Sequence, residues 1–280
     1  MIYVIAEAAC AHAGSICHAF EMVNVAVKTG CQAVKFQMFQ PELIPGLEPE
    51  LLPFLRRCEW SNGQWGDLKR TCDGRIELII TPFDLPSIAR AAELADTLKI
   101  PSGRLTDVPF MAAIRKTGKR LIGSTGMMSA DEVRQIRRMY PEVTLLHCTS
   151  EYPTKDKDVN LNVLKSTMFS GLSDHTRSTI VPALAVAMGA EIIEKHFTLS
   201  RLLDGPDQKV SLEPDELQEM VNNIRFAETV MGYKEKRVLD CEQKMIHRKV
   251  ICGQEDTRSL EQREDNRSQH ENDASRTLSA

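Results

Sequence analysis

The chain alternates between short strand-like runs and helix-like runs along most of its length. The strand-like runs lie at residues 2–8, 33–38, 77–81, 97–100, 120–124, 144–148, 168–172 and 192–196. Between most of them lie segments with apolar residues at helical spacing, such as 20–29, 85–94, 108–117 and 129–139. Strands joined by helices pair in parallel, and eight of them can close into a ring without exposed edges. The pattern therefore predicts an α/β fold, a (β/α)8 TIM barrel.

An open, doubly wound parallel sheet is the alternative fold. That fold favours a GxGxxG loop after the first strand, and this chain has none there. Polar residues also follow all eight predicted strands. This is expected of a barrel, in which the C-terminal ends of all strands surround one opening, the mouth of the barrel. We therefore expect residues 1–232 to form the barrel, with its last strong helix at 214–231.

The amino-acid composition limits the classes of molecule that the protein is expected to bind. A net charge of -4 and an aromatic content of 5% give no reason to expect nucleic acid or an anionic membrane. No signal peptide is visible, and no segment approaches the ~18 apolar residues of a membrane span. The eight cysteines form no CxxC pair and are interpreted as small buried hydrophobes, with a disulfide framework as the alternative. We expect a cytoplasmic protein.

Two histidines lie at the ends of neighbouring predicted strands. His175 follows the seventh strand beside Asp174, and His196 ends the eighth strand close to Glu194. Two imidazoles from adjacent strands predict a divalent-metal site. The alternative is that each histidine is a hydrogen-bonded core residue.

Charged residues inside apolar strands indicate a second kind of site. Lys35 and Lys99 each lie between apolar neighbours, where an ammonium needs a compensating charge. They predict a phosphate or carboxylate site, unless either lysine reaches solvent at a strand edge. Glu7, in an equally apolar strand, is a candidate for acid–base work. Further candidates at the predicted mouth are Gln37, Thr81, Asp84, Ser102, Ser124, Thr125, His147, Ser150, Tyr152 and Ser173.

Nine short motifs occur in one order between residues 2 and 232, and together they resemble the sialic acid synthase (N-acetylneuraminate synthase) family. They are IAE at 5–7, VKFQ at 34–37, TPFD at 81–84, KIPSG at 99–103, STGM at 124–127, HCTSEYP at 147–153, SDHT at 173–176, EKHFT at 194–198 and GPD at 205–207. The resemblance implies condensation of phosphoenolpyruvate with an open-chain N-acylated aldose, which gives a nine-carbon 2-keto acid and phosphate. The alternatives are a phosphorylated aldose as acceptor, or a catalytically weak homologue retained for binding.

The resemblance also implies roles for individual residues. His175 and His196 would bind a divalent metal, typically Mn2+, with Mg2+ as the alternative. The residues that would hold phosphoenolpyruvate are Lys35, Thr81, Lys99, Ser102, Ser150 and Ser173. Those that would face the sugar or the reacting carbons are Glu7, Tyr152, Glu194 and Asp207. The oligomeric state that we consider for this protein is a homodimer.

The chain departs from the family pattern in several places, including Ser150, where the family often has an asparagine, and the loop after Gln37, which is short. The family usually has Asn-His-Asn-Gly after the first strand, whereas residues 11–14 are Ala-His-Ala-Gly. The family also carries a small C-terminal antifreeze-like domain that places an arginine over the partner subunit's site. Here residues 233–252 resemble a remnant linker, and residues 253–280 are almost entirely polar. We expect a disordered tail in place of that domain, and a more open site.

Overall fold

A computed structural model describes residues 1–249 of the chain. Residues 1–232 form one compact unit, and a second unit begins at Tyr233. The described part of the second unit, residues 233–249, contains one 3-10 helix, η7 (Asp240–Arg248), and its side chains are exposed. The disordered tail expected at 253–280 lies outside the described residues, so that expectation stays a prediction.

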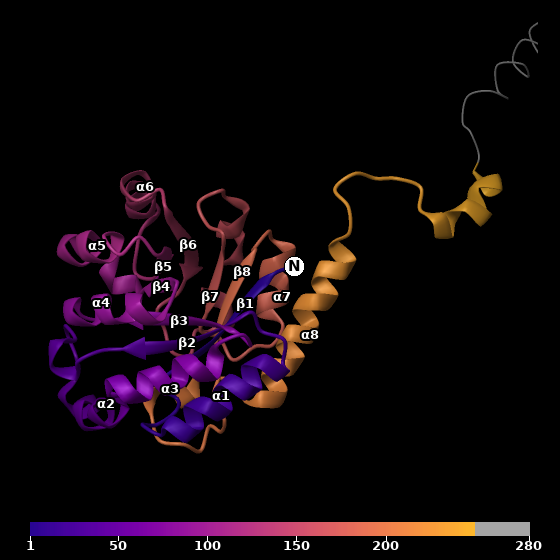
Figure 1. The fold of residues 1–280 in the computed structure, drawn as a ribbon. Coiled ribbons are helices and arrows are strands. Elements are labelled where there is room, and N and C mark those ends of the chain that lie inside the picture. Colours follow the sequence, from indigo (N-terminus) through magenta and orange to yellow (C-terminus); the bar gives the residue numbers. More distant parts are fainter. Residues whose placement is uncertain (250–280) are drawn as a thin grey trace, which may run out of the picture. The chain divides into compact units, whose positions relative to one another are not determined.

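Eight parallel strands form a closed barrel, which confirms the predicted fold and excludes the open sheet (Figure 1). Each strand pairs with the next in the chain, and the last pairs with the first. The strands are β1 (Tyr3–Ala9), β2 (Ala33–Met38), β3 (Glu77–Pro82), β4 (Thr97–Ile100), β5 (Arg120–Ser124), β6 (Val143–Cys148), β7 (Gly171–Asp174) and β8 (Ile192–His196).

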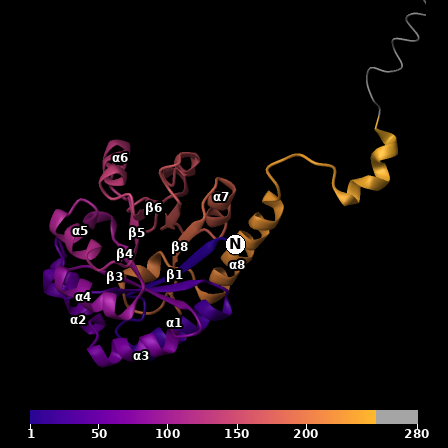
Figure 2. The same ribbon diagram turned by 45° about the horizontal axis from the view of Figure 1, so that its top comes forward.

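Helices connect the strands and lie outside the ring, as Figure 2 shows. They are α1 (Ile16–Lys28), α2 (Leu52–Cys58), α3 (Asn62–Cys72), α4 (Leu85–Leu94), α5 (Val108–Arg115), α6 (Ala130–Met139), α7 (Val181–Ala187) and α8 (Pro214–Met231). A capping box opens α6, because Ser129 and Glu132 each bind the other's backbone N–H. No helix in residues 1–249 is both long enough and apolar enough to cross a membrane.

The seventh strand begins three residues later than predicted. The sequence suggested 168–172, whereas β7 is Gly171–Asp174. A Cβ atom on Gly171 would lie 1.9 Å from the backbone oxygen of Ile192 on β8. The two strands therefore approach each other more closely than a residue with a side chain allows, and the strand starts at that glycine.

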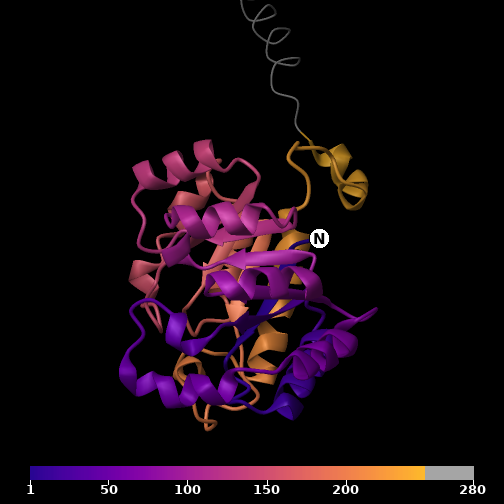
Figure 3. The ribbon, with the colours of Figure 1, turned by 60° about the vertical axis from the view of Figure 1, so that its left-hand side comes forward.

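Residues 41–64 contain four prolines, a composition that predicts an irregular loop, but the structure shows that the segment is in part helical. It contains η1 (Pro41–Leu43), η2 (Pro49–Leu51), α2 and the start of α3 (the violet segment in Figure 3). Pro41, Pro49 and Pro53 occupy the first turns of these elements, where a missing N–H costs no helical hydrogen bond. The prolines that suggest a loop at 41–64 are therefore compatible with short helices.

Side chains that alternate along the strands fill the barrel in layers. A middle layer of buried apolar residues consists of Ile5, Ala33, Ile79, Ile122 and Leu146. Because successive residues point to opposite faces of a strand, the side chains two positions further on also point into the barrel. Glu7, Lys35 and Thr81 are among them, and they lie at the C-terminal ends of the strands. The opposite strand faces pack against the helices in the main apolar core.

All seven cysteines within residues 1–249 are free thiols. Five are buried, as expected for small hydrophobes, whereas Cys17 and Cys241 are exposed. The alternative of a disulfide framework is therefore not seen among these residues.

Candidate active site

A polar cavity of about 480 Å³, including its mouth, lies at the C-terminal ends of the strands. Eleven of the twelve site residues expected from the sequence line it. They are Glu7, Lys35, Thr81, Lys99, Ser102, Tyr152, Ser173, His175, Glu194, His196 and Asp207. They come from strands spread around the ring and from the segments that follow β4, β6, β7 and β8. Only a closed barrel brings these distant parts of the chain together.

Two lysines and two glutamates form a buried ionic cluster in the wall of the cavity. Lys35 Nζ lies 2.9 Å from Glu7 Oε2 and 3.4 Å from Glu194 Oε1. Lys99 Nζ lies 3.5 Å from the same oxygen of Glu194. All four side chains are at most 5% exposed. The two ammonium groups are thus compensated by two carboxylates, as their burial requires.

Hydroxyl groups complete the contacts of this cluster. Lys35 donates to Thr81 Oγ1 at 3.2 Å, and Lys99 donates to Ser124 Oγ at 2.6 Å. Ser173 Oγ donates to Glu194 Oε1 at 2.8 Å. The second oxygen of Glu194, Oε2, is buried and accepts no hydrogen bond. That oxygen retains acceptor capacity for a ligand in the cavity.

The two glutamates differ in electrostatic environment. Burial raises the pKa of Glu7 to about 7, although Lys35 opposes that shift. Burial acts in the same direction on Glu194, but the attraction of Lys35 and Lys99 outweighs it and lowers the pKa of that carboxyl. The cavity therefore combines one carboxylate that stays ionised with one that can exchange a proton near neutral pH.

A group of hydroxyls surrounds Gly126 at the edge of the cavity. Ser102 Oγ accepts a hydrogen bond from the backbone N–H of Gly126 at 3.1 Å. Ser150, the twelfth expected site residue, does not line the cavity but approaches the same glycine. A Cβ atom on Gly126 would lie 2.0 Å from Ser150 Oγ and 2.9 Å from Ser102 Oγ. The absence of a side chain at Gly126 therefore makes room for both hydroxyls, a role that sequence reasoning missed.

The imidazole rings of His175 and His196 lie side by side in the cavity, with centroids 5.3 Å apart. His175 Nδ1 is 2.8 Å from the backbone oxygen of Thr149, which orients the ring and leaves Nε2 free. His196 Nδ1 is buried without a hydrogen-bond partner. Burial, together with the neighbouring His175, lowers the pKa of His196 well below its usual value. A low pKa keeps the imidazole of His196 neutral, and a neutral imidazole with a free nitrogen can ligate a metal.

Two further expected residues cover the histidines. The ring of Tyr152 stacks on His175 with centroids 4.1 Å apart and meets His196 edge-on at 5.9 Å. Asp207 Oδ2 accepts a hydrogen bond from the N–H of Cys10 at 3.2 Å, and burial raises the pKa of its carboxyl. Tyr152 was expected because it follows the sixth strand, whereas Asp207 lies in the 3-10 helix η6 (Pro206–Lys209), beyond the reach of strand periodicity.

Besides Ser150, three mouth candidates do not line the cavity. Asp84 caps α4 by accepting from Ser87 N at 2.8 Å. His147 Nε2 is 2.8 Å from the backbone oxygen of Val159, and the Thr125 hydroxyl donates to Leu146 O at 2.9 Å. Each follows or ends a strand but turns toward local backbone partners. Conversely, Cys148, Phe83 and Pro101 line the cavity and were not expected to, since nothing in their residue types signals a site.

Comparison with known proteins identifies relatives. The model of the NeuB family matches residues 22–236. The chain is 36% identical over 272 residues to N,N'-diacetyllegionaminic acid synthase of Legionella pneumophila, covering 86% of this chain and 76% of that protein. It is 34% identical over 290 residues to the enzyme of that name from Campylobacter jejuni, covering 92% and 86%. The crystal structure of N-acetylneuraminic acid synthetase from Leptospira borgpetersenii, in complex with citrate, superposes with a TM-score of 0.82. That pair is 31% identical and covers 88% and 90% of the two chains.

Proposed function

The chain belongs to the NeuB family of carbon–carbon bond-forming synthases, and we propose that it condenses phosphoenolpyruvate with an open-chain N-acylated aldose. The product is a nonulosonic acid, a nine-carbon 2-keto acid of the sialic acid type, and inorganic phosphate leaves. The observation that carries the proposal is the single cavity that combines paired lysines, paired glutamates and paired histidines. The relatives are named as legionaminic and sialic acid synthases, which supports an acylated sugar as acceptor.

Phosphoenolpyruvate binds, in this proposal, where the lysines and hydroxyls meet. Its phosphate and carboxylate carry several negative charges, and Lys35 and Lys99 supply the nearest positive ones. Thr81, Ser102, Ser150 and Ser173 supply hydroxyl donors around the same volume. Each lysine already faces a carboxylate, so the bound anion shares the ammonium groups with Glu7 and Glu194. This sharing limits the affinity for anions in general and favours a ligand that fits the hydroxyls as well.

His175 and His196 would hold a divalent metal, for which Mn2+ is our first choice and Mg2+ the alternative. The free Nδ1 of His196 supports this assignment, because a buried nitrogen without a partner is otherwise unfavourable. The hydrogen bond between His175 Nδ1 and Thr149 O supports it too, since a second-shell carbonyl commonly orients a ligating imidazole. When bound, such a cation polarises the aldehyde oxygen of the acceptor and makes its carbon more electrophilic.

The protein's own groups then act on the reacting carbons. The methylene carbon of phosphoenolpyruvate attacks the aldehyde carbon, and positive charge develops on the carbon that bears the phosphate. Glu194 stays ionised between the lysines and stabilises that charge. Glu7 accepts one proton of the water that adds to the same carbon and passes it to the alkoxide formed from the aldehyde. Collapse of the adduct releases phosphate, which takes the second proton of that water, and leaves the 2-keto group. Tyr152, which stacks on His175, and Asp207 line the same cavity and would contact the sugar.

The test is phosphate release from phosphoenolpyruvate in the presence of Mn2+ and a panel of acylated hexosamines. The panel contains N-acetylmannosamine, its 6-phosphate, and 2,4-diacetamido-2,4,6-trideoxy hexoses. Release that depends on a non-phosphorylated acylated sugar, with a matching nine-carbon keto acid in the mass spectrum, is the expected result. Release with the sugar phosphate alone would assign the other acceptor class. No release with any sugar, from protein that still binds phosphoenolpyruvate, would indicate a homologue retained for binding.

A further inference from the structure

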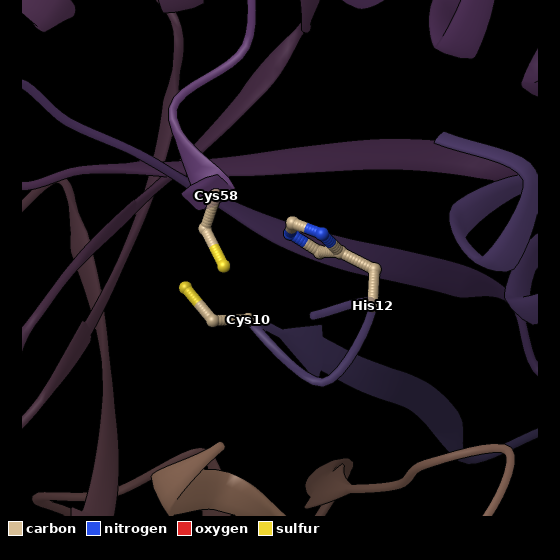
Figure 4. A group of neighbouring side chains, drawn as sticks. All are labelled: Cys10, His12 and Cys58. Atoms are coloured by element: carbon tan, nitrogen blue, oxygen red, sulfur yellow. The ribbon is translucent and has the colours of Figure 1, made fainter. Parts of the chain in front are cut away.

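Three potential metal ligands gather beside the barrel mouth, apart from the histidine pair. They are Cys10, His12 and Cys58, which are 2%, 1% and 3% exposed. The two sulfurs and an imidazole nitrogen all lie within 4.8 Å of one another. In Figure 4 the sulfurs of Cys10 and Cys58 point toward each other, and the imidazole ring lies beside them. None of the three side chains lines the substrate cavity.

The three residues come from two segments that are distant in the sequence. Cys10 follows β1 directly, and the turn from there to α1 is fixed by hydrogen bonds from Ala13 N to Cys10 O and from Ser15 N to His12 O. Cys58 is the last residue of α2. Trp60 packs against the ring of His12 with centroids 4.1 Å apart. The ligand atoms are thus held on ordered backbone and covered by an aromatic ring.

We propose that Cys10, His12 and Cys58 bind a soft divalent cation, best matched by Zn2+. Two thiolates and an imidazole are a ligand set that selects zinc over magnesium or manganese. The cavity at His175 and His196 is instead surrounded by carboxylates and hydroxyls, which suit a harder ion. Cys10 Sγ donates a hydrogen bond to Gln37 Oε1 at 3.4 Å, so this amide oxygen, whose residue also lines the substrate cavity, is a candidate fourth ligand. The assignment of this site does not rest on the condensation proposed above.

Binding has a defined proton balance. Both S–H bonds break, two sulfur–metal bonds form, and two protons leave per metal ion, with no change in oxidation state. His12 Nδ1 accepts a hydrogen bond from Gly14 N at 3.0 Å, so without metal the ring proton lies on Nε2. Ligation through Nε2 moves that proton to Nδ1 and breaks the bond from Gly14. One neutral hydrogen bond is thereby exchanged for a metal–nitrogen bond.

The expected consequence is a cross-link between the turn after β1 and the end of α2. The backbone N–H of Cys10 also donates to Asp207 Oδ2, so the cross-link would secure one wall of the substrate cavity. Zinc would therefore stabilise the mouth of the barrel without taking part in the reaction.

Cobalt titration of the reduced full-length protein tests the proposal. Co2+ bound by thiolates has a strong sulfur-to-metal charge-transfer band in the near ultraviolet, which ligation by imidazole and oxygen alone lacks. We expect that band to saturate with one ion, to be displaced by Zn2+, and to accompany release of about two protons per ion in buffer-dependent calorimetry. Cys10→Ser and Cys58→Ser should each remove half of the band or more. His12→Ala should weaken binding at least tenfold.

Two controls distinguish this site from other thiols. Cys72→Ala, which removes a buried thiol elsewhere, should leave the band unchanged. Cys148 lies 3.8 Å from His175 Nδ1, so Cys148→Ala tests whether the band arises in the substrate cavity. Loss of the band in Cys148→Ala would overturn the proposal, and so would a folded, reduced wild-type protein that shows no band. A Cys10–Cys58 disulfide in protein purified without reductant, with no uptake of cobalt after reduction, would overturn it as well.

Discussion

The ammonium of Lys99 lies 3.5 Å from the carboxylate of Glu194, and the same carboxylate oxygen faces Lys35 at 3.4 Å. The two lysines therefore converge, as their positions in apolar strands suggested, but they converge on a side chain of the protein. A substrate anion must share these charges with Glu194. This arrangement makes the glutamate, as much as the lysines, a determinant of anion affinity.

Glu194→Gln should destabilise the protein while increasing its affinity for anions. Removing one partner of a buried ion pair costs about 3–5 kcal/mol, because the remaining charges lose their compensation. Inorganic phosphate or phosphoenolpyruvate should restore part of that stability. Differential scanning fluorimetry with and without phosphate measures both effects. The control is Ser173→Ala, which removes one hydrogen bond to the same carboxylate and should cost about 1 kcal/mol. Equal responses of Glu194→Gln and wild type to phosphate would contradict this account.

Lys99→Met should raise the KM for phosphoenolpyruvate far more than the KM for the sugar. A hydrogen bond to a charged group contributes about 1.5–3 kcal/mol, which corresponds to a roughly 10- to 150-fold rise. Steady-state kinetics with each substrate varied in turn measures the two effects. Lys119→Met is a suitable control, because Lys119 pairs with an exposed carboxylate far from the cavity. Similar increases in both constants would argue against a phosphate-binding lysine.

Gly126→Ala should impair phosphoenolpyruvate binding although no charge changes. The new methyl group would lie 2.0 Å from Ser150 Oγ and 2.9 Å from Ser102 Oγ, so both hydroxyls must move. We expect the KM for phosphoenolpyruvate to rise about tenfold, because one or two hydrogen bonds to the substrate are lost. The melting temperature should change little, since the serine side chains can rotate toward solvent. Gly103→Ala is the matched control, because its Cβ would meet only the tip of Met127, at 3.9 Å.

Removal of divalent metal should abolish turnover, and His196→Ala should prevent its recovery. A chelated wild-type protein should regain activity with Mn2+, whereas the variant should not. Direct binding of Mn2+, followed by electron paramagnetic resonance, should weaken strongly in both His196→Ala and His175→Ala. His147→Ala is the control, because that ring bonds to Val159 O outside the cavity. Unchanged Mn2+ binding in the two cavity variants would exclude them as ligands.

The fold could be predicted because the strands carry their own signal. The bounds of β2, β4, β5 and β8 agree with the prediction, since each is a short apolar run between turn residues. The bounds of β7 could not be predicted, because its start depends on how closely Gly171 approaches Ile192 on the next strand. The helix α2 was missed because its prolines, which look like loop signals, occupy first-turn positions.

The candidate site was predictable to the extent that it lies on strands. The positions of Lys35 and Glu7 follow from alternation along β2 and β1, Tyr152 from its place after β6, and Asp207 from family resemblance alone. What no sequence pattern could supply was contact between distant loops. Ser150 approaches Gly126 across two strand ends, and Cys58 meets Cys10 across 48 positions of the chain. Such contacts depend on tertiary packing, which local periodicity does not encode.

The opposite end of the barrel predicts a dependence of stability on pH. Glu77 on β3 accepts hydrogen bonds from Tyr3, Thr97 and Arg120 on three other strands. Although burial opposes the shift, these bonds hold the pKa of the carboxyl below its usual value. A folded-state pKa below the unfolded one means that the stabilisation is present above the unfolded pKa, about 4.3. It is then lost as the pH falls through the folded-state pKa.

Glu77→Gln should therefore lower the free energy of unfolding at pH 7 by about 1 kcal/mol, a figure discounted because the carboxyl is partly exposed. The corresponding loss in melting temperature is about 2–4 °C for a chain of this size. The difference in melting temperature between variant and wild type should become smaller toward pH 3, where the wild-type carboxyl becomes protonated. Glu142→Gln, which breaks an exposed pair with Arg115, is the control and should change the melting temperature little at either pH. If the melting temperatures of Glu77→Gln and wild type differ by the same amount from pH 7 to pH 3, the charge of the carboxylate is not what stabilises this end of the barrel.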